Sequence, residues 1–440
     1  MVASSLLRIS NNIARRTLST AASPLSTPAM ASSEKNIVVV GGGIIGCTSA
    51  YFLTRHPKYD PSKHKITLLE ASKIAGGASG KAGGLLALWA YPSSIVPLSY
   101  RLHKELAKEH AGEERWGYRA VHCGQVDCTG RQLPERQEAV SNGVGEDVSL
   151  QKNPPKAKGK YAAAGVPKDL DWVAPDSLRA YDEMGDPTTT AQVHPLHFTT
   201  SMAELAKEKG ADIMVGASVK SINYSSSGDA VKSVTYETNG KLETIPATDV
   251  VVAAGPWTRS VYPSAPIGAM RAHSVTIRPS RDVSAYALFT QIKLPSKFPS
   301  TKSAGKHSGQ IVSPEIYARP KNEVYACGEG DHVVPLPPTS EDVQTDQGRC
   351  QEIIDFVSSI SDELRDGEVT ARQACYLPSV NGSSAPLVGP TGVKGEWMAA
   401  GHTCWGIQNG PGTGKLISEF VFDGKASSAK VQGLDPRNYL

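Results

Sequence analysis

The sequence has 440 residues, enough for one large domain or two interleaved domains with a sizeable core. Its formal net charge is only +3, and no basic stripe or acidic tail is visible, so the charge pattern argues against a nucleic-acid partner. The 7 cysteines are scattered and form neither a disulfide framework nor a zinc-binding spacing, which indicates reduced thiols and no metal site.

The first thirty residues differ in composition from the rest of the chain. They contain Arg8, Arg15 and Arg16, many serine, threonine and alanine residues, and no aspartate or glutamate. This composition is typical of a mitochondrial transit peptide, with a disordered tail as the alternative. We therefore expect residues 1–34 to lie outside the fold and to direct a mitochondrial location. Initiation at Met30 would instead give a cytoplasmic form.

A glycine turn between a short apolar strand and a helix is the strongest motif in the chain. The strand covers residues 37–40, and the helix is expected from Ile44 to about Leu53. Glycines here permit the tight bend, the approach of the backbone to a pyrophosphate, and close packing of the helix on the sheet. The anion would bind free N–H groups at the helix N-terminus. The predicted phosphate-binding residues are Gly41, Gly42, Gly43, Ile44, Ile45 and Gly46.

The uncharged run from residue 37 to residue 53 raises the alternative of a membrane span. Its triple glycine, its short length and the lack of flanking basic or aromatic anchors favour a buried strand and helix. No other stretch approaches the length of a span, so we expect none.

A second strand and its acidic end complete the motif. The strand covers residues 65–70 and ends in Glu70, 24 positions (70 − 46) after Gly46. A carboxylate at this spacing can accept hydrogen bonds from an adenosine ribose, and its charge argues against a 2′-phosphate. The order of strand, glycine turn, helix and acid therefore predicts a dinucleotide-binding βαβ unit. A glycine-rich strand end without a ligand is the alternative.

A second glycine-rich stretch follows directly. Residues 71–84 are mostly small, and the apolar residues 85–89 come next. Because ordering so many glycines costs entropy, the stretch indicates backbone pressed against a ligand. A flexible loop is the alternative.

These segments together resemble a known flavoprotein family. The turn at Gly41, the acid Glu70 and the sequence GGASGKAGG at 76–84 are similar to those of D-amino-acid oxidase, glycine oxidase and sarcosine oxidase, in a fungal-type oxidoreductase branch. The resemblance spans residues 36–423 and implies FAD in place of a dissociable nicotinamide. Segments 193–195, 210–219, 249–257 and 398–414 support it. Beyond the first turn, it implies FAD contacts for Glu70, Ala71, Ser79, Gly80, Gly83, Gly84, Val219, Ala254, Gly255, Trp257, Cys375, Gly401, His402, Gly406, Ile407, Gly412 and Thr413.

Another glycine-rich turn lies near the end of the matching region. Residues 397–400 have the pattern of a strand, and residues 406–414 are expected to turn into a helix at 415–421. N–H groups at the start of such a helix can stabilise negative charge on a reduced flavin. A glycine-capped structural turn is the alternative.

The predicted fold class is α/β. We expect a doubly wound, Rossmann-like FAD-binding domain interleaved with a smaller α+β substrate domain built on an antiparallel sheet. The FAD-binding domain is assigned residues 35–90, 190–268 and 370–430, and the substrate domain residues 91–189 and 269–369, with a mobile insertion at 130–165. Expected elements of the substrate domain are helices at 89–110 and 342–364 and strands at 116–128, 274–294 and 310–329.

The resemblance implies an oxidation performed by the flavin. A hydride moves from the carbon of a C–N bond to flavin N5, water hydrolyses the imine, and oxygen or another acceptor takes the electrons. The substrate would be a small amino acid or secondary amine. Two alternatives remain: an NAD-dependent dehydrogenase built on the first βαβ unit alone, and a flavin-binding protein with a non-catalytic role in membrane traffic.

The substrate pocket departs from the family pattern at one position. Family members hold the substrate carboxylate with an arginine in a motif that matches residues 373–378, where this sequence has Leu377. Arg319 or Arg372 could replace it, or each could form a structural salt bridge. The candidate catalytic residues, two of them aromatic pocket walls, are Tyr317, Arg319 and Trp405.

Two residues near the expected flavin leave alternatives open. Cys375 lies near the position at which some relatives attach flavin covalently. Noncovalent FAD beside a buried thiol is favoured, and linkage through Cys375 is the alternative. His402 could be a cation that stabilises the reduced ring, or a packed neutral histidine.

Overall fold

The computed structural model describes residues 34–133, 165–296, 298 and 309–440. These residues belong to one compact unit, Glu34–Leu440. The expected transit peptide, apart from Glu34, and most of the expected insertion at 130–165 lie outside the described residues.

A six-stranded sheet forms the first half of this unit. Strands β20, β12, β1, β2 and β8 run parallel in that spatial order, and β19 pairs antiparallel at the edge. The side chains of β1 alternate between two cores, with Ile37 and Val39 in one and Val38 and Val40 in the other. Because both faces of the sheet are buried, the strand is apolar along its length. The bounds are β1 Lys35–Val40, β2 His64–Glu70, β8 Ala211–Val215, β12 Asp249–Val252, β19 Leu387–Pro390 and β20 Glu396–Ala400.

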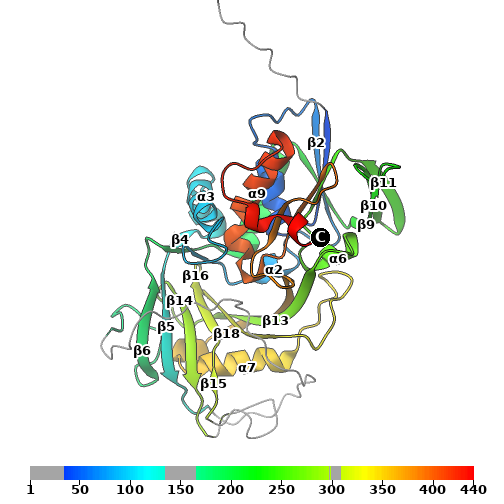
Figure 1. Ribbon diagram of the computed structural model, residues 1–440. Coiled ribbons are helices and arrows are strands. Elements are labelled where there is room, and N and C mark those ends of the chain that lie inside the picture. Colours follow the sequence, from blue (N-terminus) through cyan, green and yellow to red (C-terminus); the bar gives the residue numbers. More distant parts are fainter. Residues whose placement is uncertain (1–33, 134–164, 297, 299–308) are drawn as a thin grey trace, which may run out of the picture. The chain divides into compact units, whose positions relative to one another are not determined.

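Helices and a small sheet fill these two cores. The core around Val38 contains side chains of a three-stranded sheet, β9 Ser218–Tyr224, β10 Val231–Thr238 and β11 Lys241–Pro246. The core around Ile37 contains side chains of the short helix α4 (Gly112–Trp116) and of four longer helices, of which α3 and α9 are labelled in Figure 1. The longer helices are α1 Ile44–Leu53, α3 Val96–Glu109, α5 Pro195–Glu208 and α9 Gly406–Asp423. The bounds expected for α1 are confirmed.

Helix α3 does not belong to the second domain, to which residues 91–110 were assigned. Its residues Leu98, Leu102 and Leu106 join the core of the first sheet and pack with α9. The helical spacing of these leucines predicts that one face of the helix is buried, but it does not identify the sheet or helices against which that face packs.

Helix α9 begins at Gly406, so the predicted turn at 406–414 is wrong. Its glycines lie inside the helix, at places where other helices come close. A Cβ on Gly412 would lie 2.2 Å from the Ser99 Oγ of α3, and one on Gly414 would lie 2.5 Å from the backbone of Thr48 in α1. Close packing thus overrides the low helix propensity of glycine.

A proline also lies inside α9, at Pro411. Proline has no N–H, so the carbonyl oxygen of Ile407 loses its usual helical partner. The Nε2–H of His103, a buried side chain of α3, donates to that oxygen at 3.0 Å. The interior proline is therefore accommodated by the neighbouring helix.

An eight-stranded sheet forms the second half of the unit. Its strand order is β18, β13, β17, β16, β14, β5 and β6, with β15 paired to β14, and only β14 and β5 run parallel. Helix α7 covers one face (Figure 1). The bounds are β5 His122–Thr129, β6 Leu178–Gly185, β13 Ile267–Arg278, β14 Tyr286–Lys293, β15 Ile311–Val312, β16 Glu315–Arg319, β17 Glu323–Asp331, β18 Glu368–Val380 and α7 Gln347–Ser358.

The helix expected at 342–364 is shorter than predicted and divided. Asp346 caps α7 by accepting hydrogen bonds from the N–H groups of Gly348 and Arg349, so the helix begins after it. A separate short helix, α8, follows at Asp362–Arg365 and is capped by Ser361.

The two long strands β13 and β18 belong to both halves of the unit. At one end of the pair, Ile267 and Val380 share a small core with Met398 of the first sheet. At the other end, Ile277 lies in the core beneath α7. Residues 370–380, assigned to the FAD-binding domain, are therefore a strand of the second sheet.

Short elements connect the two sheets. Strands β3, β7 and β4 form a small antiparallel sheet, and helix α2 lies in the second glycine-rich stretch. The bounds are α2 Ala78–Lys81, β3 Leu85–Ala87, α4 Gly112–Trp116, β4 Arg119–Ala120, β7 Thr190–Gln192 and α6 Thr258–Val261.

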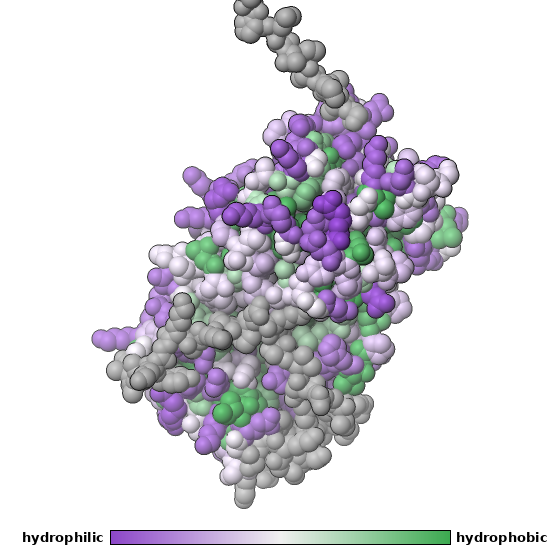
Figure 2. All heavy atoms as spheres, viewed as in Figure 1, coloured by the Kyte–Doolittle hydropathy of each residue, from purple (hydrophilic) through white to green (hydrophobic). Residues whose placement is uncertain are grey.

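The surface is mainly hydrophilic on the face shown in Figure 2, where hydrophobic side chains form small separate patches. Residues 37–53, which raised the membrane alternative, form most of β1 and all of α1 and are largely buried. Within the described part of the chain, no helix is both long enough and apolar enough to cross a bilayer.

Candidate functional site

A large cavity lies where the first sheet meets one face of the second. Part of its wall comes from the carboxyl ends of parallel strands, at Gly41 after β1, Glu70 in β2, Ala254 after β12 and Gly401 after β20. Strands β13, β16, β17 and β18 of the second sheet supply another part. Open parallel sheets bind ligands at the carboxyl ends of their strands. The location is therefore that of a cofactor site.

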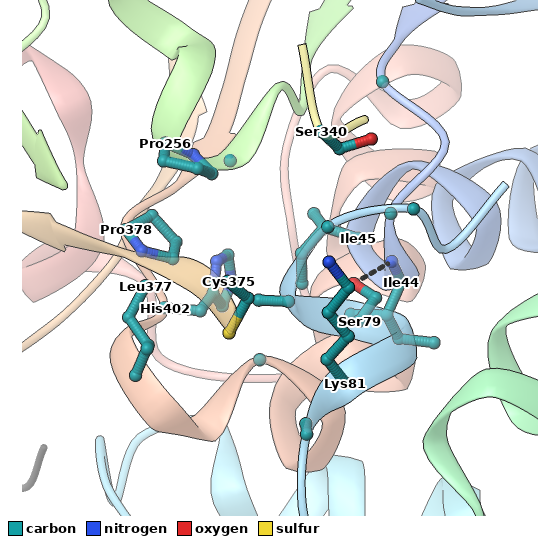
Figure 3. A pocket seen from close by; sticks show the side chains of 18 of the residues that line it. Ile44, Ile45, Ser79, Lys81, Pro256, Ser340, Cys375, Leu377, Pro378 and His402 are labelled. Atoms are coloured by element: carbon teal, nitrogen blue, oxygen red, sulfur yellow. Dashed lines mark hydrogen bonds between the residues drawn. The ribbon is translucent and has the colours of Figure 1, made fainter. Parts of the chain in front are cut away.

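The turn before α1 is built for close approach of a ligand. Gly41 has φ +107°, and a Cβ there would lie 2.6 Å from the carbonyl oxygen of Ala253. The N–H of Ile44 donates to Ser79 Oγ at 2.9 Å, which Figure 3 shows as a dashed line. The other N–H groups of the first helical turn have no acceptor within the helix, because no helical carbonyl lies one turn before them. They form an anion site at the wall of the cavity.

The Glu70 carboxylate locks this turn in place. Its Oε2 accepts from the N–H of Gly42 at 2.7 Å, and its Oε1 accepts from the N–H of Ser72 at 2.8 Å. A carboxylate offers about four acceptor positions, so room for ribose hydroxyls remains. The turn-locking role is not apparent in the sequence.

The second glycine-rich stretch passes between β16 and the chain before α5. A Cβ on Gly83 would lie 2.1 Å from the ring of Tyr317, and one on Gly84, whose φ is +94°, would lie 2.0 Å from the carbonyl oxygen of Val193. No side chain fits at either position. With the anion site and the Glu70 carboxylate, these bare walls fit the pyrophosphate and ribose of FAD.

Arg319 holds this stretch and does not line the cavity, contrary to its placement among the catalytic candidates. Its guanidinium donates to the carbonyl oxygens of Gly83, at 3.2 Å, and Ala82, and to Glu323 Oε1 at 2.8 Å. All of these partners are structural. The group that ties β16 to the glycine-rich stretch is therefore not available to a substrate carboxylate.

Arg372 is not in the cavity either. It donates to the carbonyl oxygen of Gln347 at 3.2 Å and to Gln351 Oε1 at 2.6 Å, on the α7 side of the sheet. Leu377, at the position of the family arginine, lines the cavity with an apolar side chain. The described residues that line the cavity include no arginine.

Strand β18 presents Cys375, Leu377 and Pro378 on one side of the view in Figure 3, and α2 presents Ser79 and Lys81 on the other. Burial raises the pKa of the Cys375 thiol to about 11, although the nearby Lys81 charge opposes the shift. Lys81 Nζ donates to the carbonyl oxygen of Ala374 at 2.8 Å. Cys375 is therefore a protonated thiol at neutral pH.

His402 is a packed neutral histidine rather than a cation. Burial lowers its pKa to about 3, and its Nε2 lies 3.0 Å from Thr413 Oγ1. Thr413 thus orients His402 and does not itself reach the cavity. Burial at this position thus favours the neutral form of the two alternatives.

The aromatic side chains of Tyr317, Tyr325 and Trp405 line the cavity, and Trp89, which does not line it, packs against Trp405. The ring centroids of Tyr317 and Tyr325 lie 5.8 Å apart, and those of Trp405 and Trp89 lie 5.4 Å apart. The buried Nε1–H of Trp405 has no hydrogen-bond partner within the described residues. Glu315 also lines the cavity, and the Tyr317 hydroxyl donates to its carboxylate. We call the part of the cavity lined by Glu315, Tyr317, Tyr325 and Trp405 its aromatic end.

Most of the predicted site residues meet at this one cavity. Those that line it are Gly41, Gly43, Ile44, Ile45, Glu70, Ala71, Ser79, Gly83, Gly84, Val219, Ala254, Gly255, Trp257, Tyr317, Cys375, Gly401, His402, Trp405, Gly406 and Ile407. Those that do not are Gly42, Gly46, Gly80, Arg319, Gly412 and Thr413. Gly46, Gly80 and Gly412 instead serve packing, since a Cβ on each would clash with neighbouring protein atoms.

Several lining residues were missed by sequence reasoning. Glu315 and Tyr317 are two positions apart on β16. Because residues two apart on a strand lie on the same face, the sequence could have placed Glu315 beside Tyr317. Ser340 lies on the chain after β17, and its Oγ is 2.6 Å from that of Ser72. No local pattern in the sequence marks that contact. No group of three or more metal-ligating side chains suited to an ion occurs in the ranges that the structure describes.

Comparison with known proteins gives a consistent result. A family model described as "FAD dependent oxidoreductase" matches residues 36–420. TDA3 of Saccharomyces cerevisiae is 35% identical over 92% of this chain and 95% of its own. C1F5.03c of Schizosaccharomyces pombe is 35% identical over 93% of this chain and 100% of its own. Both names class the proteins only provisionally as oxidoreductases and state no substrate. D-amino acid dehydrogenase of Dechloromonas aromatica is 22% identical over 88% of this chain and 96% of its own.

Solved structures show the same fold. Glycine oxidase from Geobacillus kaustophilus superposes with a TM-score of 0.63 at 18% identity, over 93% of this chain and 100% of its own. L-proline dehydrogenase from P. horikoshii gives a TM-score of 0.63 at 17% identity, over 92% and 98%. The predicted α/β class, with its parallel and antiparallel sheets, is confirmed.

Proposed function

This chain belongs to the family of FAD-dependent oxidoreductases, and from that premise we propose that it oxidises the C–N bond of an amine or amino-acid-like substrate. The observation that carries the proposal is that the phosphate-binding turn at Gly41 and the aromatic end at Tyr317 and Trp405 line the same cavity. Such a cavity can hold a dinucleotide and, beside its aromatic residues, a small molecule.

Different residues of the chain would bind different parts of the cofactor. The first N–H groups of α1 and the bare backbone at Gly43 would hold the pyrophosphate, and Glu70 would hold the ribose. When bound, FAD accepts a hydride from the carbon of a C–N bond and passes the electrons to oxygen or another acceptor. Tyr317 and Trp405 would exclude water and orient the substrate.

The substrate class draws support from relatives. Proteins named 4-methylaminobutanoate oxidase, dimethylglycine dehydrogenase and glycine oxidase are 22–23% identical to this chain over most of its length. All three names specify an amine or amino acid. The FAD family match also weighs against the nicotinamide-dependent alternative.

An anaerobic absorption experiment tests the proposal. The purified FAD-loaded protein is mixed with a panel of primary amines, secondary amines and amino acids, and the flavin bands are followed. Bleaching by a member of the panel, restored by air or an artificial acceptor, is the expected result. Bound flavin that no panel member bleaches would contradict the proposal and favour the alternative of a non-catalytic flavin-binding protein.

We also propose a mitochondrial location, which rests on the composition of the first thirty residues. A full-length chain with a C-terminal fluorescent tag should co-localise with a mitochondrial marker. A second chain that begins at Met30 should distribute through the cytoplasm. Identical patterns for the two chains would exclude a targeting role for residues 1–29.

A further inference from the structure

A lysine side chain lines the cavity near the phosphate-binding turn, and we infer that it binds the diphosphate of the cofactor as its counter-ion. Lys81 is the residue assigned to this role. The assignment rests on the proposed placement of FAD in this cavity and adds a charged side chain to the backbone groups that hold it. It does not depend on which substrate is oxidised.

Helix α2 places Lys81 close to this turn. Two residues earlier on α2, Ser79 Oγ accepts from the N–H of Ile44 at 2.9 Å, and a Cβ on Gly43 would lie 3.1 Å from the same oxygen. Figure 3 shows the Lys81 side chain between those of Ser79 and Cys375. Lys81 therefore belongs to the part of the cavity wall that also includes the anion site at the start of α1.

The contacts of the Lys81 ammonium group leave it able to bind an anion. Its Nζ donates to the carbonyl oxygen of Ala374 at 2.8 Å, and within the described part of the chain no carboxylate forms an ion pair with it. An ammonium group has three N–H donors, so two remain for a ligand or for water. The Ala374 contact also holds the tip of the side chain, so less conformational freedom is lost when an anion binds.

The surroundings of Lys81 make its positive charge unfavourable as long as no anion is near. Burial is the main cause that lowers the pKa of its ammonium group, and the charge of Lys73, an exposed lysine of the same stretch, acts in the same direction. The negative charge of a diphosphate would offset both effects. Binding of the cofactor and protonation of Lys81 therefore favour each other.

Among the described residues, the cavity offers a diphosphate no second cationic side chain. Its lining residues there include no arginine, and Lys81 is their one lysine. His273 and His402 also line the cavity, but burial lowers their pKa values to about 4 and about 3. The first N–H groups of α1 carry only a partial positive charge, and the nearby Glu70 carboxylate is bonded to the same turn. The full positive charge available to the diphosphate is therefore that of Lys81.

The affinity of the full-length protein for FAD tests the assignment without turnover. FAD-loaded protein is diluted in steps at low and at high salt, and free FAD is separated by ultrafiltration. Lys81→Gln keeps an N–H donor and removes the charge. We expect it to raise the dissociation constant of FAD by about ten- to a hundredfold, the usual contribution of a hydrogen bond to a charged group. Salt should weaken FAD binding less in this variant than in the unmodified protein, because salt screens the charge pair.

Two further variants serve as controls. Lys73 is exposed and does not line the cavity, so Lys73→Gln should keep the FAD affinity within about twofold of that of the unmodified protein. Lys81→Arg keeps the charge and should retain most of the affinity, which would show that Lys81→Gln does not act through loss of the fold. Equal FAD affinity of the unmodified protein and Lys81→Gln, or equal losses in the Gln and Arg variants, would overturn the assignment.

Other measurements distinguish the diphosphate from other anions that the cavity could hold. The reduction potential of the bound flavin reports positive charge beside the ring, and it should be the same in Lys81→Gln and the unmodified protein. A lower potential at unchanged FAD affinity would overturn the assignment and place the cation at the ring. Weaker binding of amino acids at unchanged FAD affinity would overturn it in favour of a substrate carboxylate. FAD affinity that depends on Lys81 in a protein that no amine bleaches would refute the proposed oxidation while supporting the counter-ion.

Discussion

Gly43 and Gly46 have different roles: the first leaves room for the cofactor and the second allows close packing. Substitution of each residue should distinguish the two roles. A Cβ on Gly43 would approach only Ser79 Oγ, at 3.1 Å, whereas one on Gly46 would lie 1.9 Å from the carbonyl oxygen of Gly41. We expect Gly43→Val to fold and to lose bound FAD, because its side chain would enter the proposed pyrophosphate site. Gly46→Ala should instead lower the free energy of unfolding by about 1–3 kcal/mol through overpacking.

Two measurements decide this prediction. The ratio of flavin to protein absorbance reports the cofactor content, and chemical denaturation of FAD-free protein reports the stability. A Gly43→Val protein with full flavin content would contradict the placement of the phosphate.

The protonation state of Cys375 determines whether FAD can be linked to the chain covalently through its sulfur. Burial raises the pKa of its thiol to about 11, so little of the nucleophilic thiolate exists at neutral pH. We expect acid precipitation to leave the flavin in the supernatant, and Cys375→Ser to retain the same FAD content. Flavin that stays with the precipitate, and is released by Cys375→Ser, would establish the covalent alternative.

At the scale of elements, α9 depends on glycine for its contacts with α1. A Cβ on Gly414 would lie 2.5 Å from the backbone of Thr48, whereas nothing lies within 4 Å of a Cβ on Gly433. We expect Gly414→Ala to lower the free energy of unfolding by about 1–3 kcal/mol. Gly433→Ala should change it by about 0.5 kcal/mol or less. Equal denaturation midpoints for the two variants would show that the helices can separate without cost.

The same helix shows where sequence reasoning succeeded and where it failed. The first βαβ unit was predicted well because its signals are local: an apolar strand, a glycine turn and an acid at the expected spacing. Residues 406–414 were predicted as a turn because glycine favours turns, yet packing against α1 and α3 makes them helical. Local propensity cannot report the contacts that override it.

The candidate site divides in a similar way. Its glycine-rich walls carry a strong pattern, so most of the residues predicted for FAD do line the cavity. Arg319 and Glu315 lie on the same strand, and only the structure shows that the first ties down a loop while the second faces the cavity. The presence of a charged residue in a sequence does not show which way its side chain points.

For the whole molecule, three buried histidines predict how stability depends on pH. Burial is the main cause that lowers the pKa values of His103 and His273 to about 4 and that of His402 to about 3. In the unfolded chain these groups titrate near 6.5. Between about pH 6.5 and 4 the unfolded state therefore binds protons that the folded state does not, and stability falls as the pH falls.

Each such histidine contributes a slope of up to about 1.4 kcal/mol per pH unit in this window. We expect the melting temperature to drop between pH 7 and pH 5, and the drop to be smaller in His103→Gln, which keeps a donor for Ile407 but has no titrating ring. A melting temperature that is the same at pH 7 and pH 5 would contradict the neutral assignment of the three side chains.

The long strands β13 and β18 have a mechanical consequence for access to the cavity. They pair without a break in the ladder from Ile267 and Val380 at least to Thr276 and Ala371, and they enter the cores of both halves. Two bodies joined by a continuous hydrogen-bonded ribbon cannot swing apart as lids do around a flexible linker, because the ribbon would have to bend in the middle of a sheet. Substrate traffic must then rely on the loops that border the cavity, and the two walls that hold the cofactor keep a fixed spacing while it turns over.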